Sequence, residues 1–222
     1  VYCDTGGEHE SNMKFLKDCE KWYGRNIIIL KNPNYKDHFD VIKKHKFITN
    51  TYGYAYCTHK LKMDMRQEAG YCDSINIFGY TLEEEKRSKK LQEHNIDMVC
   101  EFPLIDNKIT KEDCLGMIWK SGIELPLMYK LGYSHNNCIG CIKGGLGYWN
   151  KIKKDFPEYF ERMSKLEKEL GLTVLKFRSG ERKGERMYLD ELEPHMGNYM
   201  QEPSITCGID CHMNLSEIDN EN

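Results

Sequence analysis

Apolar residues recur at regular spacing near the start of the chain. Met13, Leu16 and Cys19 are three residues apart, which predicts an amphipathic helix. This helix spans residues 11–23 and ends before Gly24, a residue that commonly terminates helices. Short apolar runs typical of strands lie on both sides of it. The resulting strand–helix–strand order predicts a parallel sheet with helices on its faces.

The same patterns continue along the chain. The predicted strands are residues 1–5, 26–30, 74–80 and 98–102, with 173–177 as a further strand or an extended arm. The predicted helices are residues 11–23, 39–45, 64–69, 82–94, 110–121, 125–131 and 156–170. Thr110 and Asp113 have the spacing of a capping box at the start of their helix. Residues 1–170 therefore form an α/β domain, and the strand 26–30 should be buried.

Residues 171–222 are polar and rich in glycine and glutamate, which predicts a C-terminal extension with little regular structure. The extension carries two cysteines, Cys207 and Cys211. At the other end, the chain opens at Val1 in what reads as a strand already in progress. We therefore expect further sequence upstream.

Composition narrows the class of protein. The 222 residues are 40% hydrophobic and 30% charged, which is typical of a globular domain. The net charge of −3 gives no bulk signal for nucleic-acid binding. No apolar run approaches the roughly 20 residues of a membrane span, and no signal peptide is visible. These features predict a cytoplasmic protein without a membrane partner.

Ten cysteines are many for such a protein. Cys138 and Cys141 form a Cys-x-x-Cys pair, and Cys207 and Cys211 form a Cys-x-x-x-Cys pair. A secreted disulfide scaffold is usually shorter, with evenly spread cysteines, so the spacing favours metal or cluster binding over disulfides. Three other cysteines have apolar neighbours and are expected in the core: Cys19, Cys100 and Cys114.

The Cys-x-x-Cys pair is the strongest local signal. Two thiolates at this spacing can hold one metal ion or one iron–sulfur cluster from a tight turn. Gly144 and Gly145 follow at once and permit the positive φ that such a turn often needs. The alternative is an ordinary turn that carries two buried thiols.

Asp4, Thr5 and Gly6 lie where the first strand ends. Ligands of doubly wound sheets bind at the carboxyl ends of strands, and a carboxylate there can accept from ribose hydroxyls or an adenine amino group. The alternative is an aspartate that only caps its loop.

Cationic residues follow two further elements. Lys60 and Lys62 could neutralise phosphates and lower the pKa of the nearby Cys57 thiol, or they could form a solvated basic turn. Arg87 lies in a helix just after a strand end, where an anion could bind. The alternative for Arg87 is an exposed pair with Glu83.

Several of these segments together resemble the phosphoadenosine phosphosulfate (PAPS) reductase family of the adenine nucleotide alpha hydrolase-like superfamily. The resemblance covers most of residues 1–170, and it is nearest to a reductase-like branch close to the DNA phosphorothioation sulfurtransferases. The segments that carry it are Val1-Tyr2-Cys3-Asp4-Thr5-Gly6, Cys57-Thr58-x-x-Leu61-Lys62, Gly79-Tyr80-Thr81 with Arg87, Phe102-Pro103-Leu104, Ile109-Thr110-Lys111-Glu112-Asp113 and the loop around Cys138.

The resemblance implies a doubly wound, mostly parallel sheet of about five strands with helices on both faces. It implies an adenylyl nucleotide across the strand ends. The nucleotide-binding residues would be Asp4, Thr5, Gly6, Lys60, Lys62 and Arg87. The family's Ser-Gly-Gly-x-Asp-Ser phosphate loop is absent from this chain and is expected upstream of Val1. Thr81 stands where the family has an arginine, which makes PAPS itself a less favoured substrate.

Cluster-bearing members of the family have a cysteine pair followed about 80 residues later by Cys-x-x-Cys. Here Cys57 precedes Cys138 by 81 residues, with Tyr56 in place of the second cysteine. The resemblance thus implies a [4Fe–4S] cluster, or alternatively zinc, on Cys57, Cys138, Cys141 and Cys211. Cys207 is the alternative fourth ligand, and zinc could also take His135 or His212.

The family's reductases end in Glu-Cys-Gly-x-His, whose cysteine attacks the sulfate sulfur. Cys207-Gly208 keeps the core of that motif without its flanking residues, so Cys207 is the candidate nucleophile. The expected function is sulfonucleotide reduction or ATP-dependent sulfur transfer. Candidate partners are an adenine nucleotide, a thioredoxin-like reductant or sulfur donor, a nucleic-acid acceptor and a second copy of the chain. The alternative is a binding module with a structural zinc on the same cysteines.

Overall fold

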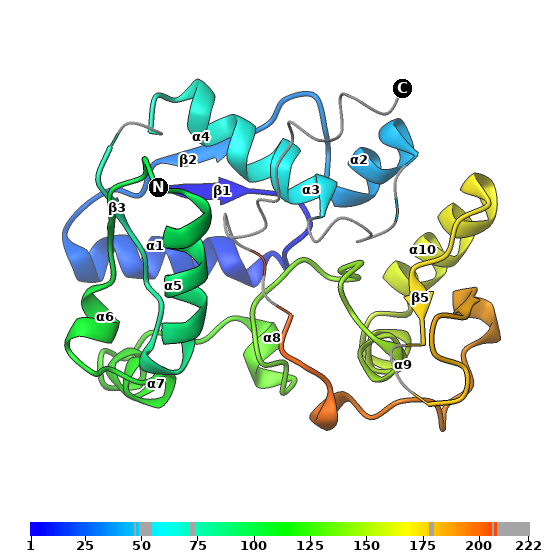
Figure 1. Cartoon of the computed structure of the whole chain (residues 1–222). Helices are drawn as coiled ribbons and strands as arrows, with labels where there is room; N and C mark the ends of the chain where they lie inside the picture. The colour runs from blue at the N-terminus through cyan, green and yellow to red at the C-terminus, as the bar shows by residue number, and fades with distance from the viewer. Residues whose placement is uncertain (47, 49–54, 72–73, 178–179, 206, 208–222) are drawn as a thin grey trace.

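The computed structural model combines helices with short two-stranded sheets (Figure 1), and it describes residues 1–46, 48, 55–71, 74–177, 180–205 and 207. Strand β1 (Tyr2–Asp4) pairs in parallel with β2 (Ile29–Lys31), and β3 (Asn76–Ile77) pairs in parallel with β4 (Cys100–Glu101). Strand β5 (Leu175–Lys176) is antiparallel to β6 (Arg186–Met187). The predicted α/β class is confirmed.

The strands differ from the predicted single sheet of about five strands. Within the described residues they form separate pairs rather than one sheet. Tyr2 of β1 and Phe78, just after β3, both line a large cavity, so the two parallel pairs border different parts of its wall. The strand after Asn26 was expected to be buried, but Ile28 and Ile29 are 52% and 45% exposed. Strand β2 has β1 as its only pairing partner in the described chain, which leaves its other edge uncovered.

The predicted helices are present with small changes of boundary. The helical elements are α1 (Ser11–Tyr23), α2 (His38–His45), α3 (Tyr56–Thr58), the π-helical η1 (His59–Met63), α4 (Asp64–Glu68), the 3₁₀ turn η2 (Leu82–Glu84), α5 (Glu85–His94), α6 (Pro103–Asp106), α7 (Lys111–Lys120), α8 (Leu127–Lys130), α9 (Leu146–Asp155), α10 (Pro157–Leu170), and the 3₁₀ turns η3 (Leu189–Glu191) and η4 (Tyr199–Gln201). Gly24 ends α1 in the left-handed conformation, and Thr110 and Asp113 form the predicted capping box. The sequence did not predict α6 or α9.

The main core lies around α9 and α10. Trp149, Ile152 and Met163 from these helices are fully buried, together with Phe39 of α2. Leu189 of η3 is also fully buried in this core, so part of the predicted C-terminal extension packs with the preceding helices. Figure 1 shows α5, α6 and α7 on the side of the molecule away from α9 and α10. No helix in the described part of the chain is long and apolar enough to cross a membrane.

A buried carboxyl group joins α10 to the C-terminal region. Glu167 is 0% exposed and accepts hydrogen bonds from the backbone N–H groups of Val174 and Leu189, the latter at 2.8 Å. Burial raises the pKa of Glu167 from 4.5 to about 7, because the desolvation of the charged form outweighs these hydrogen bonds.

This burial predicts a pH-dependent stability difference between the wild type and Glu167→Gln. The folded-state pKa of Glu167 lies above its unfolded value, so its stabilising contribution is present below pH 4.5 and is lost as the pH rises through about 7. The free energy of unfolding of the wild type, relative to the variant, should fall by at most about 3 kcal/mol between pH 4.5 and 8. Urea titrations at several pH values measure it. Glu161→Gln, at an exposed position of the same helix, should show no such trend, and an equally flat result for Glu167→Gln would contradict the prediction.

Candidate functional site

The turn after β1 is held by its own backbone and by a lysine. Asp4 Oδ1 accepts a hydrogen bond from the N–H of Gly6 at 2.9 Å, and Asp4 Oδ2 pairs with Lys31 Nζ at 2.8 Å. Gly6 has a φ of +66°, and a Cβ there would lie 1.9 Å from the Lys36 carbonyl oxygen. Only glycine fits this position without strain.

The Cys-x-x-Cys loop docks directly on this turn. The N–H of Ile139 donates to the carbonyl of Gly7 at 2.8 Å, and Thr5 Oγ1 lies 3.1 Å from Cys138 Sγ. A Cβ on Gly7 would lie 2.4 Å from His38 Nδ1 and 3.0 Å from Cys138 Sγ. The missing side chain of Gly7 therefore lets the cysteine loop approach the end of β1.

One tyrosine organises the cysteine loop from α9. The hydroxyl of Tyr148 accepts hydrogen bonds from the N–H groups of Gly140 at 3.1 Å and Cys141 at 3.0 Å, and donates to the Cys138 carbonyl at 3.3 Å. Tyr148 is itself buried. The loop conformation thus depends on a side chain that lies outside the motif.

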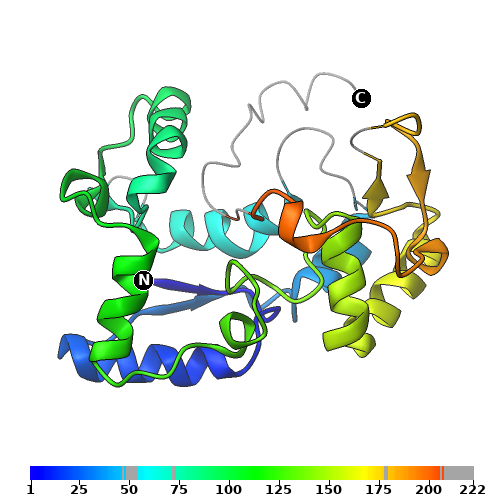
Figure 2. The same ribbon diagram turned by 90° about the horizontal axis from the view of Figure 1, so that it is seen from below.

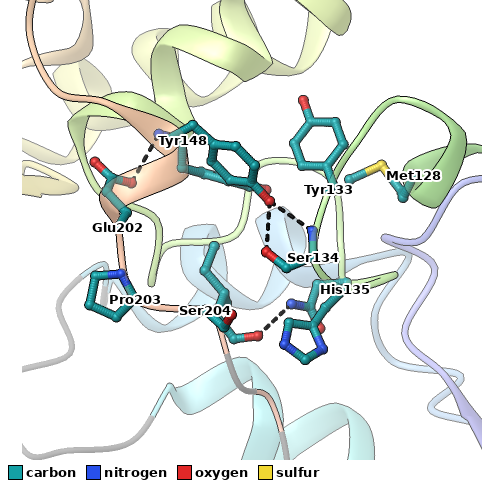
Figure 3. Close-up of a pocket in the computed structure, with 11 residues that line it drawn as sticks. Met128, Tyr133, Ser134, His135, Tyr148, Glu202, Pro203 and Ser204 are labelled. Atoms are coloured by element: carbon teal, nitrogen blue, oxygen red, sulfur yellow. Dashed lines mark hydrogen bonds between the residues drawn. The ribbon is translucent and has the colours of Figure 1, made fainter. Parts of the chain in front are cut away.

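Residues 198–205, which we call the C-terminal strap, run beside the same loop. Glu202 accepts from the N–H groups of Gly147 at 2.6 Å and Tyr148 at 3.0 Å, at the start of α9 (Figure 3). Asn137 Nδ2 donates to the Ile205 carbonyl at 2.7 Å. Figure 2 shows η4 of the strap beside the start of α9. These contacts hold the strap against the cysteine loop and α9, and Cys207 is two residues beyond the end of the strap.

Electrostatic coupling links four of the predicted cysteines to one lysine, Lys62. Burial raises the pKa of Cys57, Cys138 and Cys141, that of Cys141 to about 12, and the negative charge of Cys207 raises all three further. The Lys62 ammonium acts in the opposite direction on each of the three thiols. Segments far apart in the sequence therefore supply these thiols, of which Cys141 is buried and the other three are partly buried.

Cys207 differs from the other three thiols. Burial opposes its ionisation, but the Lys62 ammonium and a hydrogen bond with the Thr58 hydroxyl, at 3.3 Å, bring its pKa below the usual value. Burial likewise opposes the charge on Lys62, whereas the Cys207 and Cys138 thiolates raise its pKa. The arrangement favours a Cys207 thiolate beside a Lys62 ammonium, which is the reactive form of a cysteine.

The donor set of this site suits a soft metal or an iron–sulfur cluster, because thiolates are the preferred ligands of both. Among the described residues, no group of three or more cysteine, histidine or acidic side chains is arranged to hold a metal ion. Cys211 and His212, two of the predicted ligands, lie outside the described residues. His135, another predicted ligand of zinc, contacts a lysine: its Nδ1 is 3.5 Å from Lys111 Nζ.

A cavity of about 1150 Å³ opens beside the thiols. Cys207 and Lys62 are part of its wall, as are Phe78 and Tyr80 after β3. Arg87 lines it as well, with its guanidinium 4.3 Å from the centre of the Tyr80 ring and 2.5 Å from Glu84 Oε1. The volume is ample for a nucleotide-sized ligand.

The predicted nucleotide-binding residues fall into two groups. Lys62 and Arg87 line the cavity, whereas Asp4, Thr5, Gly6 and Lys60 are not among its lining residues. Lys60 instead pairs with Asp64 at 2.9 Å. Sequence reasoning missed Tyr148, Glu202 and Thr58, because nothing in their local sequence indicates the long-range contacts that they make.

Comparison with known proteins found two curated relatives, both uncharacterized proteins of Methanocaldococcus jannaschii. One is 21% identical over 181 residues, which are 77% of this chain and 42% of the relative. The other is 24% identical over 186 residues, which are 76% of this chain and 36% of the relative. The chain thus spans less than half the length of either relative. No family model and no solved structure matches.

The docking of the cysteine loop predicts a specific effect of Gly7→Ala. The new methyl group would collide with His38 and Cys138, so the variant should lose about 1–3 kcal/mol of unfolding free energy and expose Cys138 to alkylation. Denaturant titration and mass spectrometry of iodoacetamide-treated protein measure both effects. Gly116→Ala in α7, where a Cβ meets no atom within 4 Å, is the matched control. Equal stability and labelling in the two variants would refute the steric account.

Proposed function

We propose that this chain is part of an enzyme of adenylyl-nucleotide-dependent sulfur chemistry, related to the PAPS reductases. The observation that carries the proposal is the Cys207 thiol, which lies on the wall of the large cavity together with Lys62, the ammonium that lowers its pKa. A thiolate held beside a cation is a nucleophile, and the cavity gives it a place to meet a ligand.

The nucleotide would bind in the cavity with Lys62 and Arg87 as its charged contacts. Phe78 and Tyr80, whose ring centres are 5.4 Å apart, would provide an aromatic surface for a base. The doubly wound sheet of about five strands also belongs to this proposal. A further parallel strand could join β1 and β3, since Ile75, just before β3, and Ile77, within it, are 61% and 66% exposed.

In the reductive version, the Cys207 thiolate attacks the sulfonyl sulfur of a sulfonucleotide. The new S–S bond forms as the sulfur–oxygen bond to the nucleotide breaks, and the nucleotide phosphate leaves with the electron pair. A second thiol then attacks Cys207 Sγ, releases sulfite and leaves a disulfide, which a dithiol reductant of the thioredoxin type reduces. The two electrons come from the two thiols.

In the transfer version, ATP converts an acceptor oxygen into an adenylate and releases pyrophosphate. A persulfide on Cys207, loaded by an external sulfur donor, attacks the activated carbon, and AMP leaves with the electron pair. A second thiol then attacks Cys207 Sγ, so the carbon keeps the transferred sulfur and the two cysteines form a disulfide. This proposal also includes a nucleic acid as the acceptor, a cytoplasmic location and association with a second copy of the chain.

Cys57, Cys138, Cys141 and Cys211 are the proposed ligands of a [4Fe–4S] cluster or zinc. Such a group would fix the thiolates and supply positive charge beside the nucleotide. The support for it is the chemistry of the described donors, which are three thiols whose ionisation the Lys62 ammonium favours.

Sulfite or AMP production tests the proposal directly. The full-length protein is given adenosine phosphosulfate or PAPS with a dithiol, or ATP with a persulfide donor and an RNA acceptor. Cys207→Ser should reduce product formation at least about 100-fold, because its hydroxyl is a far weaker nucleophile than a thiolate. Cys19→Ser, at a buried thiol in α1, should keep activity. Wild-type protein that consumes none of these nucleotides would contradict the proposed function.

Measuring the metal content distinguishes the cysteines that bind the metal from the cysteine that acts as the nucleophile. Cys138→Ala should lose the bound iron or zinc of anaerobically purified protein, because a tetrathiolate site loses a ligand, whereas Cys207→Ala should keep it. Elemental analysis and the absorbance near 400 nm measure this, and Cys114→Ala is the control. Metal lost only from Cys207→Ala would make Cys207 a ligand rather than the nucleophile. One zinc ion per chain, together with no turnover of any nucleotide, would favour the alternative of a binding module with a structural zinc.

A further inference from the structure

A second polar group lies on the wall of the large cavity, apart from the cysteines. Lys111, the first residue of α7, donates from Nζ to the Ser134 carbonyl. The same ammonium is 3.5 Å from His135 Nδ1, and both side chains line the cavity. Helix α7 and the loop before the Cys-x-x-Cys pair thus meet at these two residues.

The Lys111 ammonium has no carboxylate among its close partners. The Ser134 carbonyl and the His135 ring are both neutral acceptors, and Lys111 forms no ion pair with a carboxylate among the described residues. Its side chain is half-buried, and burial lowers its pKa, opposed by Glu84 and by Glu83, whose carboxylate accepts from the Lys111 backbone N–H at 3.2 Å. A partly desolvated cation with neutral partners is costly, and an anion in the cavity would relieve that cost.

His135 adds a hydrogen-bond donor to the same place. Burial and the Lys111 ammonium lower the pKa of His135, so its ring is neutral at pH 7. Because the ammonium donates to Nδ1, the ring proton resides on Nε2. An ammonium and an imidazole N–H are therefore presented together, which is a donor set that suits a phosphate.

We propose that Lys111 and His135 form an oxyanion subsite that holds a phosphate group in the cavity. This inference rests on the proposed function, because the phosphate would be that of the adenylyl nucleotide or the pyrophosphate that leaves it. Lys62 and Lys86 also line the cavity, and Lys62 is the lysine whose charge lowers the pKa of Cys207. Lys111 would then hold the phosphate, whereas Lys62 would stabilise the Cys207 thiolate.

Calorimetric titration of the full chain with AMP, adenosine and pyrophosphate tests the subsite. Lys111→Gln should weaken AMP binding by about 10-fold or more and leave adenosine binding unchanged, since only the charge-assisted contact is lost. Lys111→Arg should restore most of the AMP affinity. Lys120→Gln, exposed on the same helix, should behave as the wild type. His135→Gln should weaken AMP binding by a smaller factor.

Binding of the three ligands shows which phosphate the subsite holds. It also separates a failure of the subsite from a failure of the proposed function. Weaker pyrophosphate binding in Lys111→Gln, with AMP unaffected, would support the subsite and assign it to the leaving group. Unchanged binding of both AMP and pyrophosphate in Lys111→Gln would overturn the subsite and leave the proposed function standing. A wild type that binds pyrophosphate through Lys111 but neither AMP nor adenosine would support the subsite and count against the adenine nucleotide. A wild type that binds none of the three would overturn both.

Discussion

The effect of the Lys62 ammonium on four buried or partly buried thiols is the interaction on which the candidate site depends. Burial alone would keep all four thiols protonated. One cation cannot offset this for every thiol. Cys138 has a comparable hydrogen bond with Thr5, but burial and the Glu8 carboxylate outweigh it, whereas Lys62 and the Thr58 hydrogen bond outweigh burial at Cys207. The result is one thiol with a lowered pKa beside three with raised values. That asymmetry supports the assignment of Cys207 as the nucleophile.

The position of these thiols depends on close approaches made by residues outside the cysteine motifs. Gly7 lets the cysteine loop reach the turn after β1, and Tyr148 fixes that loop from α9. Gly147 has the same role for the strap, because a Cβ there would lie 2.3 Å from the N atom of Tyr199. Glu202 then ties the strap to α9. The geometry of the site therefore depends on the packing around α9 as much as on the reactive groups of the site.

Local signals predicted much of the fold, and long-range contacts account for the rest. Helix α1, with its Gly24 stop, and the Thr110 capping box were read correctly because their signals lie within a few residues. Helix α9 was missed because Gly147 within it, and Gly144 and Gly145 just before it, weaken the helical pattern. The grouping of Cys57, Cys138, Cys141 and Cys211 came from their order and spacing, and it stays a prediction because Cys211 lies outside the described residues. The ion pair that holds Lys60 away from the cavity could not be read from the sequence, because the same basic turn fits either role.

Nucleotide protection of Cys207 tests the central claim most directly, because it requires the thiolate and the cavity to belong to one site. The full-length protein is alkylated under reducing, anaerobic conditions with and without a saturating adenylyl nucleotide, and mass spectrometry follows each cysteine. The account predicts that nucleotide slows the modification of Cys207 at least about 10-fold and leaves Cys19 unaffected. Identical Cys207 rates with and without nucleotide would contradict it.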